Sequence, residues 1–316
     1  MPKSKLLQMN HHNNTGEFIL IGFSSLPLVK MWLTPALLLV YGFTIVENVF
    51  LIVLVRVNPH LHTPMYFFLG HFSFLECWYT TTIIPKTLHI LITGNTTILF
   101  TTCIAQLYVF ISLGATECLF LATMAYDRYV AICYPLHYSV MIRNKLCILL
   151  VLCSWIGGFL TPVLPTVFVS KLHFCKFLIN HFFCDFPALL QLSCSGTSHI
   201  ELLSSIISST IIMGSFIVIT FSYIQIVWTI CVLPSKQGMQ KALSTCSSHL
   251  VVVFIYYGSG IYMYVRPNSY KTLETNKLVA LLYAVLTPLL NPIIYSFRNN
   301  DVIKAVGRFK IINIIK

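Results

Sequence analysis

Residues 101–133 read TTCIAQLYVFISLGATECLFLATMAYDRYVAIC and decide the fold class. More than twenty mostly apolar residues end at an acid and a base side by side, Asp127 and Arg128. A transmembrane helix needs about 20 such residues to cross a bilayer. The whole chain of 316 residues has the same character, with 57% hydrophobic residues, 9% charged residues and a mean hydropathy of +0.81. We therefore expect a membrane protein rather than a soluble domain.

Together with this stretch, the other apolar stretches of the chain predict seven spans in total, each long enough to cross the hydrocarbon core as a helix. They cover residues 31–55, 65–85, 101–126, 146–165, 200–233, 242–265 and 278–297. The sequence thus predicts an all-α membrane protein, a seven-transmembrane helix bundle over residues 29–298. An N-terminal tail precedes it over 1–28, and a cytoplasmic segment follows over 299–316. In that segment, residues 299–311 have the pattern of a short basic amphipathic helix that lies on the membrane surface.

The net charge of +11 does not indicate nucleic-acid binding. The lysines and arginines are spread along loops and tails, and they form no basic stripe with aromatic residues between them. Basic residues at helix ends suit lipid headgroups instead. We expect membrane lipids as partners and no nucleic acid.

Two Asn-X-Thr sequons indicate the orientation. Asn13 lies in the N-terminal tail and Asn95 lies between the second and third spans, so seven spans place both on one face. Glycosylation needs the exterior face. We predict glycosylation at both sites and a multi-pass protein of the plasma membrane, with an extracellular N-terminus and a cytoplasmic C-terminus. No apolar signal region precedes residue 18, so we expect the first span to direct its own insertion.

Four of the eleven cysteines gather at the same face. They are Cys103, Cys175, Cys184 and Cys194. An oxidising exterior suits disulfides, and four cysteines allow three pairings between which this reasoning does not choose. Three of the four fall in the loop from about 166 to 199. A cross-link from this loop to Cys103 would make the loop a lid over the bundle.

No catalytic arrangement is present in the sequence. It has no nucleophile elbow, no glycine-rich phosphate loop and no helical zinc-binding spacing, so we expect no enzymatic activity. One loop fragment, with His181, Cys184 and Asp185, could bind a soft metal such as copper. That alternative needs a free thiolate, whereas Cys184 is a candidate disulfide partner. We therefore predict no metal site.

Three acids lie inside expected spans: Glu47, Glu76 and Glu117. An ionised side chain at the centre of a membrane helix costs about 2.5–3.5 kcal/mol. Glu76 and Glu117 both fall near the middle of their spans. If these two acids face each other, they share a proton or bind a small cation such as sodium. The alternative is two neutral acids that are hydrogen-bonded separately.

Helical spacing connects Glu117 with the acid-base pair. Phe110, Glu117 and Arg128 are separated by whole numbers of turns and share one face of the third span. An aromatic position, a midplane acid and a base at the cytoplasmic edge thus follow one another along the helix. The order of these residues along the helix does not by itself establish an energetic coupling between the two ends of the span.

Four motifs carry a family resemblance: PMYFFL (64–69), MAYDRYVAIC (124–133), KALSTCSSHL (241–250) and PLLNPIIYSFRN (288–299). With them, the chain resembles the vertebrate odorant (olfactory) receptors, which are rhodopsin-like (class A) G-protein-coupled receptors. The resemblance begins at GEFILIGF (16–23) and covers almost the whole chain. It implies a receptor that binds small volatile, mostly lipophilic odorants within the bundle. It also implies activation of a heterotrimeric G protein of the stimulatory olfactory type, which raises cyclic AMP.

The resemblance also implies roles for single residues. Asp127 would hold Arg128 at rest and release it to the G protein. The activation set is Asp127, Arg128, Tyr129, Tyr223, Asn291, Pro292 and Tyr295. Glu76 and Glu117 match the acids of the family's sodium site, so a bound sodium ion is expected as the possible cofactor. The family's disulfides would join Cys103 to Cys184 and Cys175 to Cys194.

Spacing and the resemblance together place an odorant pocket above Tyr257 and Gly258. The expected ligand-binding residues are Phe110, Ile111, Gly114, Ala115, Ile207, Ile211, Tyr257, Ile261 and Tyr264. For each of them, ordinary helix packing is the alternative. The clearest departure from the family is Glu47, because the family usually has glycine before the asparagine that stands here as Asn48.

A transporter or channel is the rival function, with Glu47, Glu76 and Glu117 as a relay. The sequence shows no inverted repeat of the kind found in many transporters, and the Asp-Arg-Tyr triplet also favours the receptor.

Overall fold

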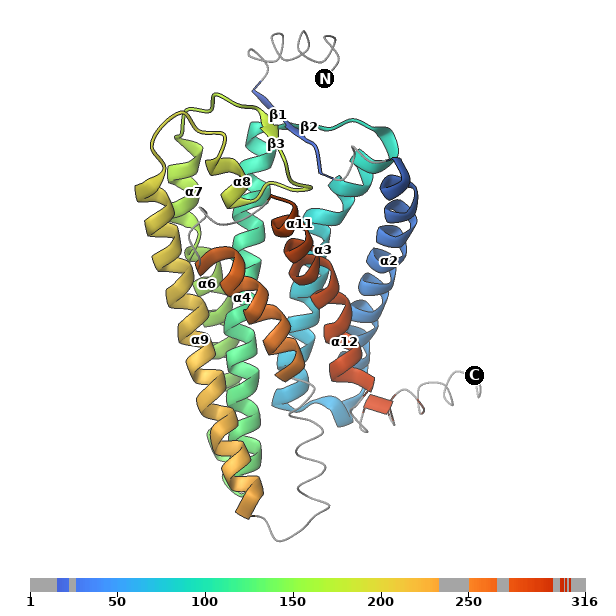
Figure 1. Ribbon diagram of the computed structural model, residues 1–316. Coiled ribbons are helices and arrows are strands. Elements are labelled where there is room, and N and C mark those ends of the chain that lie inside the picture. Colours follow the sequence, from blue (N-terminus) through green and yellow to red (C-terminus); the bar gives the residue numbers. More distant parts are fainter. Residues whose placement is uncertain are drawn as a thin grey trace.

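The structure, a computed structural model, describes residues 16–22, 27–232, 250–265 and 273–297, and four positions between 302 and 307. Long helices run side by side as a bundle (Figure 1). The first five spans are α2 (Pro27–Val57), α3 (Pro64–Thr93), α4 (Phe100–Cys133), α6 (Asn144–Leu160) continued by α7 (Val163–Ser170), and α9 (Ser198–Val232). A helix over 250–265, which ends in the π-helical turn η3 (Ile261–Val265), is the sixth. The seventh consists of α11 (Leu273–Leu281), the π-helical turn η5 (Leu282–Leu286) and α12 (Thr287–Phe297).

The lengths and composition of these helices agree with a membrane protein. Five are long and apolar enough to cross a bilayer: Lys30–Val57, Phe100–Cys133, Asn144–Ser170, Ser198–Val232 and Lys277–Ile294. The helix α3 has 30 residues, but Glu76, Lys86 and several threonines make it less apolar. The sixth span is described only from Leu250, as a shorter apolar helix. The predicted seven-helix membrane bundle is confirmed.

The fourth span is interrupted where the sequence predicted a continuous helix over 146–165. The helix α6 ends at Leu160, and α7 begins at Val163. Pro162 has no N–H group, and its ring clashes with the carbonyl of the preceding turn. The hydroxyl of Thr161 donates to the Gly157 carbonyl at 2.7 Å, so a side chain contributes to the hydrogen bonding at this break.

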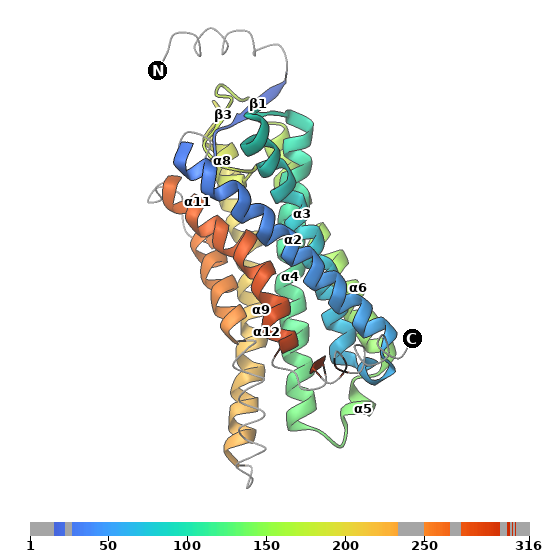
Figure 2. The same cartoon turned by 90° about the vertical axis from the view of Figure 1, so that its right-hand side faces the viewer.

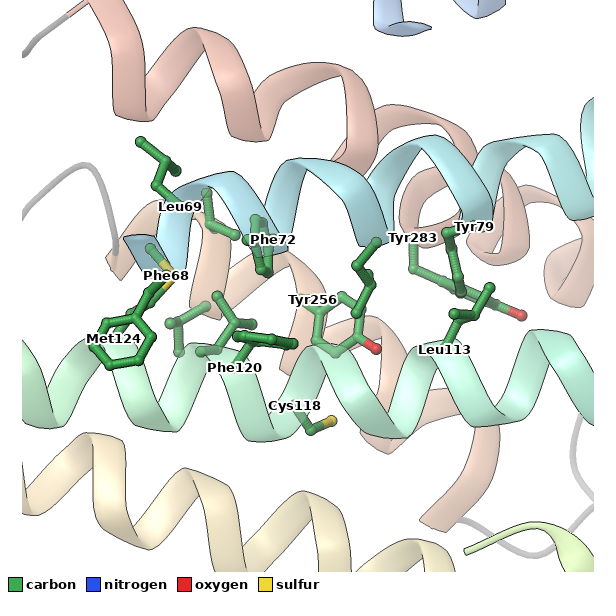
Figure 3. Close-up of a cluster of buried hydrophobic side chains, with 14 of the residues drawn as sticks. Phe68, Leu69, Phe72, Tyr79, Leu113, Cys118, Phe120, Met124, Tyr256 and Tyr283 are labelled. Atoms are coloured by element: carbon green, nitrogen blue, oxygen red, sulfur yellow. The ribbon is translucent and has the colours of Figure 1, made fainter. Parts of the chain in front are cut away.

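The helix α4 is the centre of the bundle. In its most apolar window 72% of the residues are buried, compared with 17% in α9. Side chains from α3 and α4, among them Phe72 and Phe120, point toward each other in the core (Figure 3). The outer faces carry exposed apolar residues such as Leu39 and Trp228, which in a bilayer meet lipid tails. The bundle therefore has a packed apolar core and an apolar outer surface.

A small sheet covers one end of the bundle, which we call the lid end. The strand β1 (Glu17–Leu20) lies between β2 (Thr97–Leu99), which is antiparallel to it, and β3 (Leu178–Ile179), which is parallel to it. Phe18 and Leu20 on β1 are buried. Sequence analysis placed residues 17–20 in an N-terminal tail. They form the central strand instead, because these two alternating apolar side chains pack on the loops beneath them.

Two disulfides hold the lid, which we define as residues 171–197. Cys103 in the first turn of α4 is joined to Cys184, and Cys175 is joined to Cys194, each with a Cα–Cα distance of 5.5 Å. The lid contains β3 and the short helix α8 (Phe186–Leu190), and it lies far from α5 (Tyr138–Met141) at the opposite end (Figure 2). The lid is thus tied both to the central helix and to the N-terminal strand.

The contact between strand and lid can be tested at Gly22, which has a φ of +49°. A Cβ atom there would lie 3.2 Å from the Cα of Phe182, whereas at Gly16, with a φ of +61°, it would meet nothing within 4 Å. An alanine at either position carries the cost of left-handed backbone, about 1 kcal/mol. Only Gly22→Ala should also displace β1 from the lid, because its Cβ atom would be too close to Phe182. We expect it to lower the unfolding temperature of the detergent-solubilised protein by several degrees more than Gly16→Ala.

Equal shifts in the two alanine variants would contradict this account, since only the backbone cost would then be measured.

Candidate functional site

An apolar cavity lies in the half of the bundle nearer the lid. It is enclosed by α3, α4, α9, the 250–265 helix and η5, and Phe186 of α8 contributes from the lid. Its enclosed volume is about 70 Å³, and its lining is mainly apolar and aromatic with a few hydroxyl groups. A lining of this kind is typical of small-molecule sites.

Aromatic rings close the cavity toward the lid. The ring of Phe110 on α4 stacks on that of Tyr79 on α3, with centroids 5.1 Å apart. The same ring lies 4.7 Å from Phe183 of the lid and 6.0 Å from Tyr283 of η5. Phe110 therefore joins three structural elements at the top of the cavity.

Two adjacent tyrosines close the cavity on the other side. The hydroxyl of Tyr256 donates to the Gly114 carbonyl at 2.7 Å, which ties the sixth span to α4. The hydroxyl of Tyr257 donates to Ser215 Oγ at 2.7 Å, which ties it to α9. A Cβ atom at Gly114 would lie 3.4 Å from the Tyr256 hydroxyl, an ordinary van der Waals contact, so only a side chain larger than alanine would crowd this hydroxyl. Figure 3 shows Tyr256 beside α4 in the same region as Tyr79 and Tyr283.

Most of the residues that we expected to bind ligand meet at this cavity. Six of the nine line it: Phe110, Ile111, Gly114, Ala115, Ile211 and Tyr257. Ile207 and Ile261 do not, and the side chain of Tyr264 lies outside the described part of the structure. On α9, Ser204 and Ser208 line the cavity together with Ile211 and Ile212.

Sequence reasoning missed ten residues of the lining. They are Tyr79, Cys118, Thr161, Phe186, Ser204, Ser208, Ile212, Tyr256, Gly260 and Tyr283. A spacing of four residues places Ser204, Ser208 and Ile212 on one face of α9. The sequence-based prediction chose apolar residues on this helix and therefore did not include the two serines. Tyr283 had no such signal, because it lies in a π-helical turn that shifts the register of the seventh span.

The acids Glu76 and Glu117 form a pair deep in the bundle. Both are fully buried, and they are close enough for their charges to interact. Asn291 of α12 donates its amide to Glu76 Oε1. The other oxygen of Glu76, both of Glu117 and Oδ1 of Asn291 have no hydrogen-bond partner in the described part of the chain. Tyr256 and Asn291 both lie beside the Glu117 carboxylate. The structure thus brings the two acids and the amide of Asn291 together in one place.

Glu47 stands apart from this pair. It lies on α2, and its two carboxylate oxygens are shielded and accept no hydrogen bond from the residues that the structure describes. Its neighbour Asn48 donates to the Thr44 carbonyl of its own helix at 2.9 Å. Nothing in the structure explains the acid at this position.

The acid of the Asp-Arg-Tyr triplet has a hydrogen-bond partner that the sequence did not predict. Asp127 is buried and accepts a hydrogen bond from Tyr138 of α5 at 2.8 Å. Arg128 is half-buried and forms no ion pair with any residue that the structure describes. Neighbouring residues on a helix point about 100° apart, so Asp127 faces α5 rather than Arg128. Burial, followed by the Asp127 carboxylate, raises the pKa of Tyr138, which keeps its hydroxyl a donor.

The rest of the expected activation set is spread over three spans. Tyr223 is buried on α9, and Tyr129 Oη lies 3.5 Å from the hydroxyl of Tyr134. Asn291 and Pro292 lie inside α12, where Asn291 joins the acid pair. The side chain of Tyr295 lies outside the described part.

The fragment proposed as an alternative metal site has other roles. Cys184 is in a disulfide, and Asp185 accepts from the Phe186 N–H at 2.9 Å at the start of α8. His181 is buried between the rings of Phe182 and Phe183. Burial and, to a smaller extent, Lys277 lower the pKa of His181 to about 3. With no thiolate available, the metal alternative is wrong, and no group of three such side chains in the described residues could hold a metal ion.

These features together define a seven-helix membrane protein with an internal apolar cavity of the kind that binds small molecules. Comparison with known proteins gives the family, because the sequence model of the olfactory receptors matches residues 37–312. The chain is 45% identical to rat olfactory receptor 226, over 95% of this chain and 93% of that protein. It is 45% identical to human olfactory receptor 6A2 (94% and 92% covered) and 47% identical to human olfactory receptor 11L1 (92% and 91% covered).

The chain therefore belongs to the olfactory receptor family. It is a multi-pass membrane protein that takes odorants as ligands, couples to G proteins and is not an enzyme.

Proposed function

We propose that small, mostly lipophilic odorants bind in the cavity beneath the lid, and that the receptor then activates a G protein of the stimulatory olfactory type and raises cyclic AMP. The cavity is the observation that carries this proposal. Its apolar and aromatic lining suits volatile molecules, and the hydroxyls of Ser204, Ser208 and Tyr256 offer hydrogen bonds that can orient them.

The two tyrosines at the inner side of the cavity suggest how binding acts on the bundle. Tyr256 and Tyr257 link the sixth span to α4 and α9, so a ligand that favours another arrangement of these helices must shift both hydrogen bonds. An odorant that binds the active state a hundredfold more tightly supplies about 2.7 kcal/mol of bias.

At the opposite end of the bundle, this free-energy preference for the active state would act on the activation set. Arg128 would meet the G protein after Asp127, Tyr129, Tyr223, Asn291, Pro292 and Tyr295 rearrange. Because Asp127 is bonded to Tyr138, the restraint at rest acts through α5. Release of this contact would let α4 and α5 move relative to each other.

The proposed orientation places the lid end outside the cell, in the plasma membrane, with the C-terminus in the cytoplasm. The two disulfides suit an oxidising exterior. Asn95, the predicted glycosylation site at this end, is exposed beside β2, whereas Asn13 lies outside the described residues. Of the expected surface helix over 299–311, the structure describes only four residues as helical. Membrane lipids would contact the exposed apolar faces of the spans.

We also propose that Glu76 and Glu117 hold a sodium ion or share a proton, with Asn291 as a neighbour. The carboxylate oxygens that have no hydrogen-bond partner in the part of the chain that the structure describes support this proposal. A sodium ion there would supply positive charge between two buried carboxylates, which cannot both be ionised without it.

The cavity can be tested by filling it at Gly114. Gly114→Val adds methyl groups next to the Tyr256 hydroxyl, so we expect at least a tenfold loss of odorant potency in a cyclic AMP assay. Gly214→Val is the matched control, since a Cβ there meets nothing within 4 Å and the residue is exposed on α9. A full response in Gly114→Val, or an equal loss in both variants at equal surface levels, would contradict the assigned site.

The coupling role of Arg128 is tested in the same assay. Arg128→Ala should abolish the cyclic AMP response, because the proposed contact with the G protein is gone. Arg143→Ala removes an exposed arginine near the same end and should respond normally. Binding of an antibody to an N-terminal tag on intact cells would show that the receptor reaches the cell surface. The same result would show that its N-terminus is extracellular. An intact response in Arg128→Ala would refute the role of this arginine.

The acid pair is tested by the unfolding temperature of purified receptor in sodium chloride and in choline chloride. Sodium should raise it in the wild type but not in Glu76→Gln, which removes a ligand charge. Glu47→Gln, a change at the other intramembrane acid, should keep the sodium effect. A wild type that responds to pH but not to sodium would show that the pair shares a proton instead.

A further inference from the structure

A second cavity lies at the end of the bundle opposite the lid. It is formed where α2 ends and where α3 and α6 begin, beside the short 3-10 helix η2 (Pro59–Leu61). Its volume is about 960 Å³ including its opening. The odorant cavity shares none of its lining residues.

The lining of this cavity has a polar part and an apolar part. Arg56, His62, Thr63 and Asn144 are exposed and form the polar part. The apolar part includes Phe67 and Ile148, and Ile148 is 52% exposed although it is apolar. Exposed apolar side chains next to exposed cationic ones mark the boundary between hydrocarbon and headgroups in a membrane protein.

The positive charge at this cavity is not neutralised within the described chain. The Arg56 side chain makes no ion pair or hydrogen bond to the described residues, and its carbonyl oxygen lies 3.3 Å from His62 Nε2. Lys145 adds another exposed cation nearby. The acid that the structure describes at this end is Asp127, which is buried and bonded to Tyr138. An anion from outside the chain would therefore be attracted to the polar part.

We propose that this cavity binds an anionic phospholipid of the cytoplasmic leaflet. Its phosphate lies at Arg56, His62 and Asn144, and an acyl chain covers Phe67 and Ile148. The inference rests on the proposed orientation, which places this end in the leaflet that is rich in anionic lipids. A free phosphate would fill only the polar part, whereas a phospholipid matches both parts at the depth where its headgroup lies.

The test is native mass spectrometry of the purified full-length receptor in detergent, titrated with phosphatidylserine and with phosphatidylcholine. We expect tighter binding of phosphatidylserine in the wild type. Arg56→Gln should weaken it about fivefold, the contribution of one basic residue near an anionic surface, and leave phosphatidylcholine unchanged. Lys145→Gln is the matched control, because Lys145 is exposed at the same end but does not line the cavity, and its effect should be clearly smaller.

A second variant, Ile148→Ser, shortens the apolar part without a change of charge, and it should weaken phosphatidylserine binding as well. Soluble glycerophosphoserine, which lacks acyl chains, should not compete.

Equal binding in the wild type and Arg56→Gln would overturn the proposal, as would equal losses in Arg56→Gln and Lys145→Gln. Competition by glycerophosphoserine would show an anion site without a lipid. Because binding in detergent needs neither an odorant nor a G protein, failure here is distinct from failure of the proposed receptor function.

Discussion

The rest of the structure depends on the absence of water in the bilayer core. A polar group inside a span must find its partner within the chain, which is why the membrane-spanning segments are helices. Threonines and serines along the spans follow the same constraint, since Thr80, Ser112 and Ser222 each donate to the carbonyl four residues earlier. Against this background, the oxygens of Glu76 and Glu117 that have no hydrogen-bond partner among the described residues are among the exceptions. They lie at the level where α3, α4 and α12 meet, so whatever satisfies them also affects how these helices pack.

The seven spans could be predicted because bilayer thickness sets a minimum length for an apolar helix, and that length is visible in the sequence. Features set by a few residues were harder to predict. The strand β1 has four residues, and Tyr138 reaches Asp127 from beyond the end of α4. In the cavity, spacing identified Phe110 and Gly114, because α4 is a regular helix. The same reasoning could not place Tyr283, since the π-helical turn breaks the periodicity on which it relies.

The two ends of the bundle are built differently. At the lid end, two disulfides and a three-stranded sheet join three parts of the chain: the N-terminal strand, the stretch from β2 to Cys103, and the lid. At the opposite end, the described contact that holds Asp127 is one hydrogen bond between side chains. Gly114 and Asp127 lie on the same helix, α4, so the odorant cavity and the activation set share one element. The two sites are therefore physically connected through one helix.

The position of β1 at the centre of the lid-end sheet has a consequence for synthesis. The strand is made first, but its partners are residues 97–99 and 178–179, and Cys103 must wait for Cys184, which lies 81 residues later. The sheet can therefore close only after four spans have entered the membrane. Until then, β1 lacks its partner strand β3, and Phe18 and Leu20 lack the part of their packing surface that the lid residues supply. A chain that stalls before the lid is translocated would therefore carry an incomplete sheet at this end of the bundle.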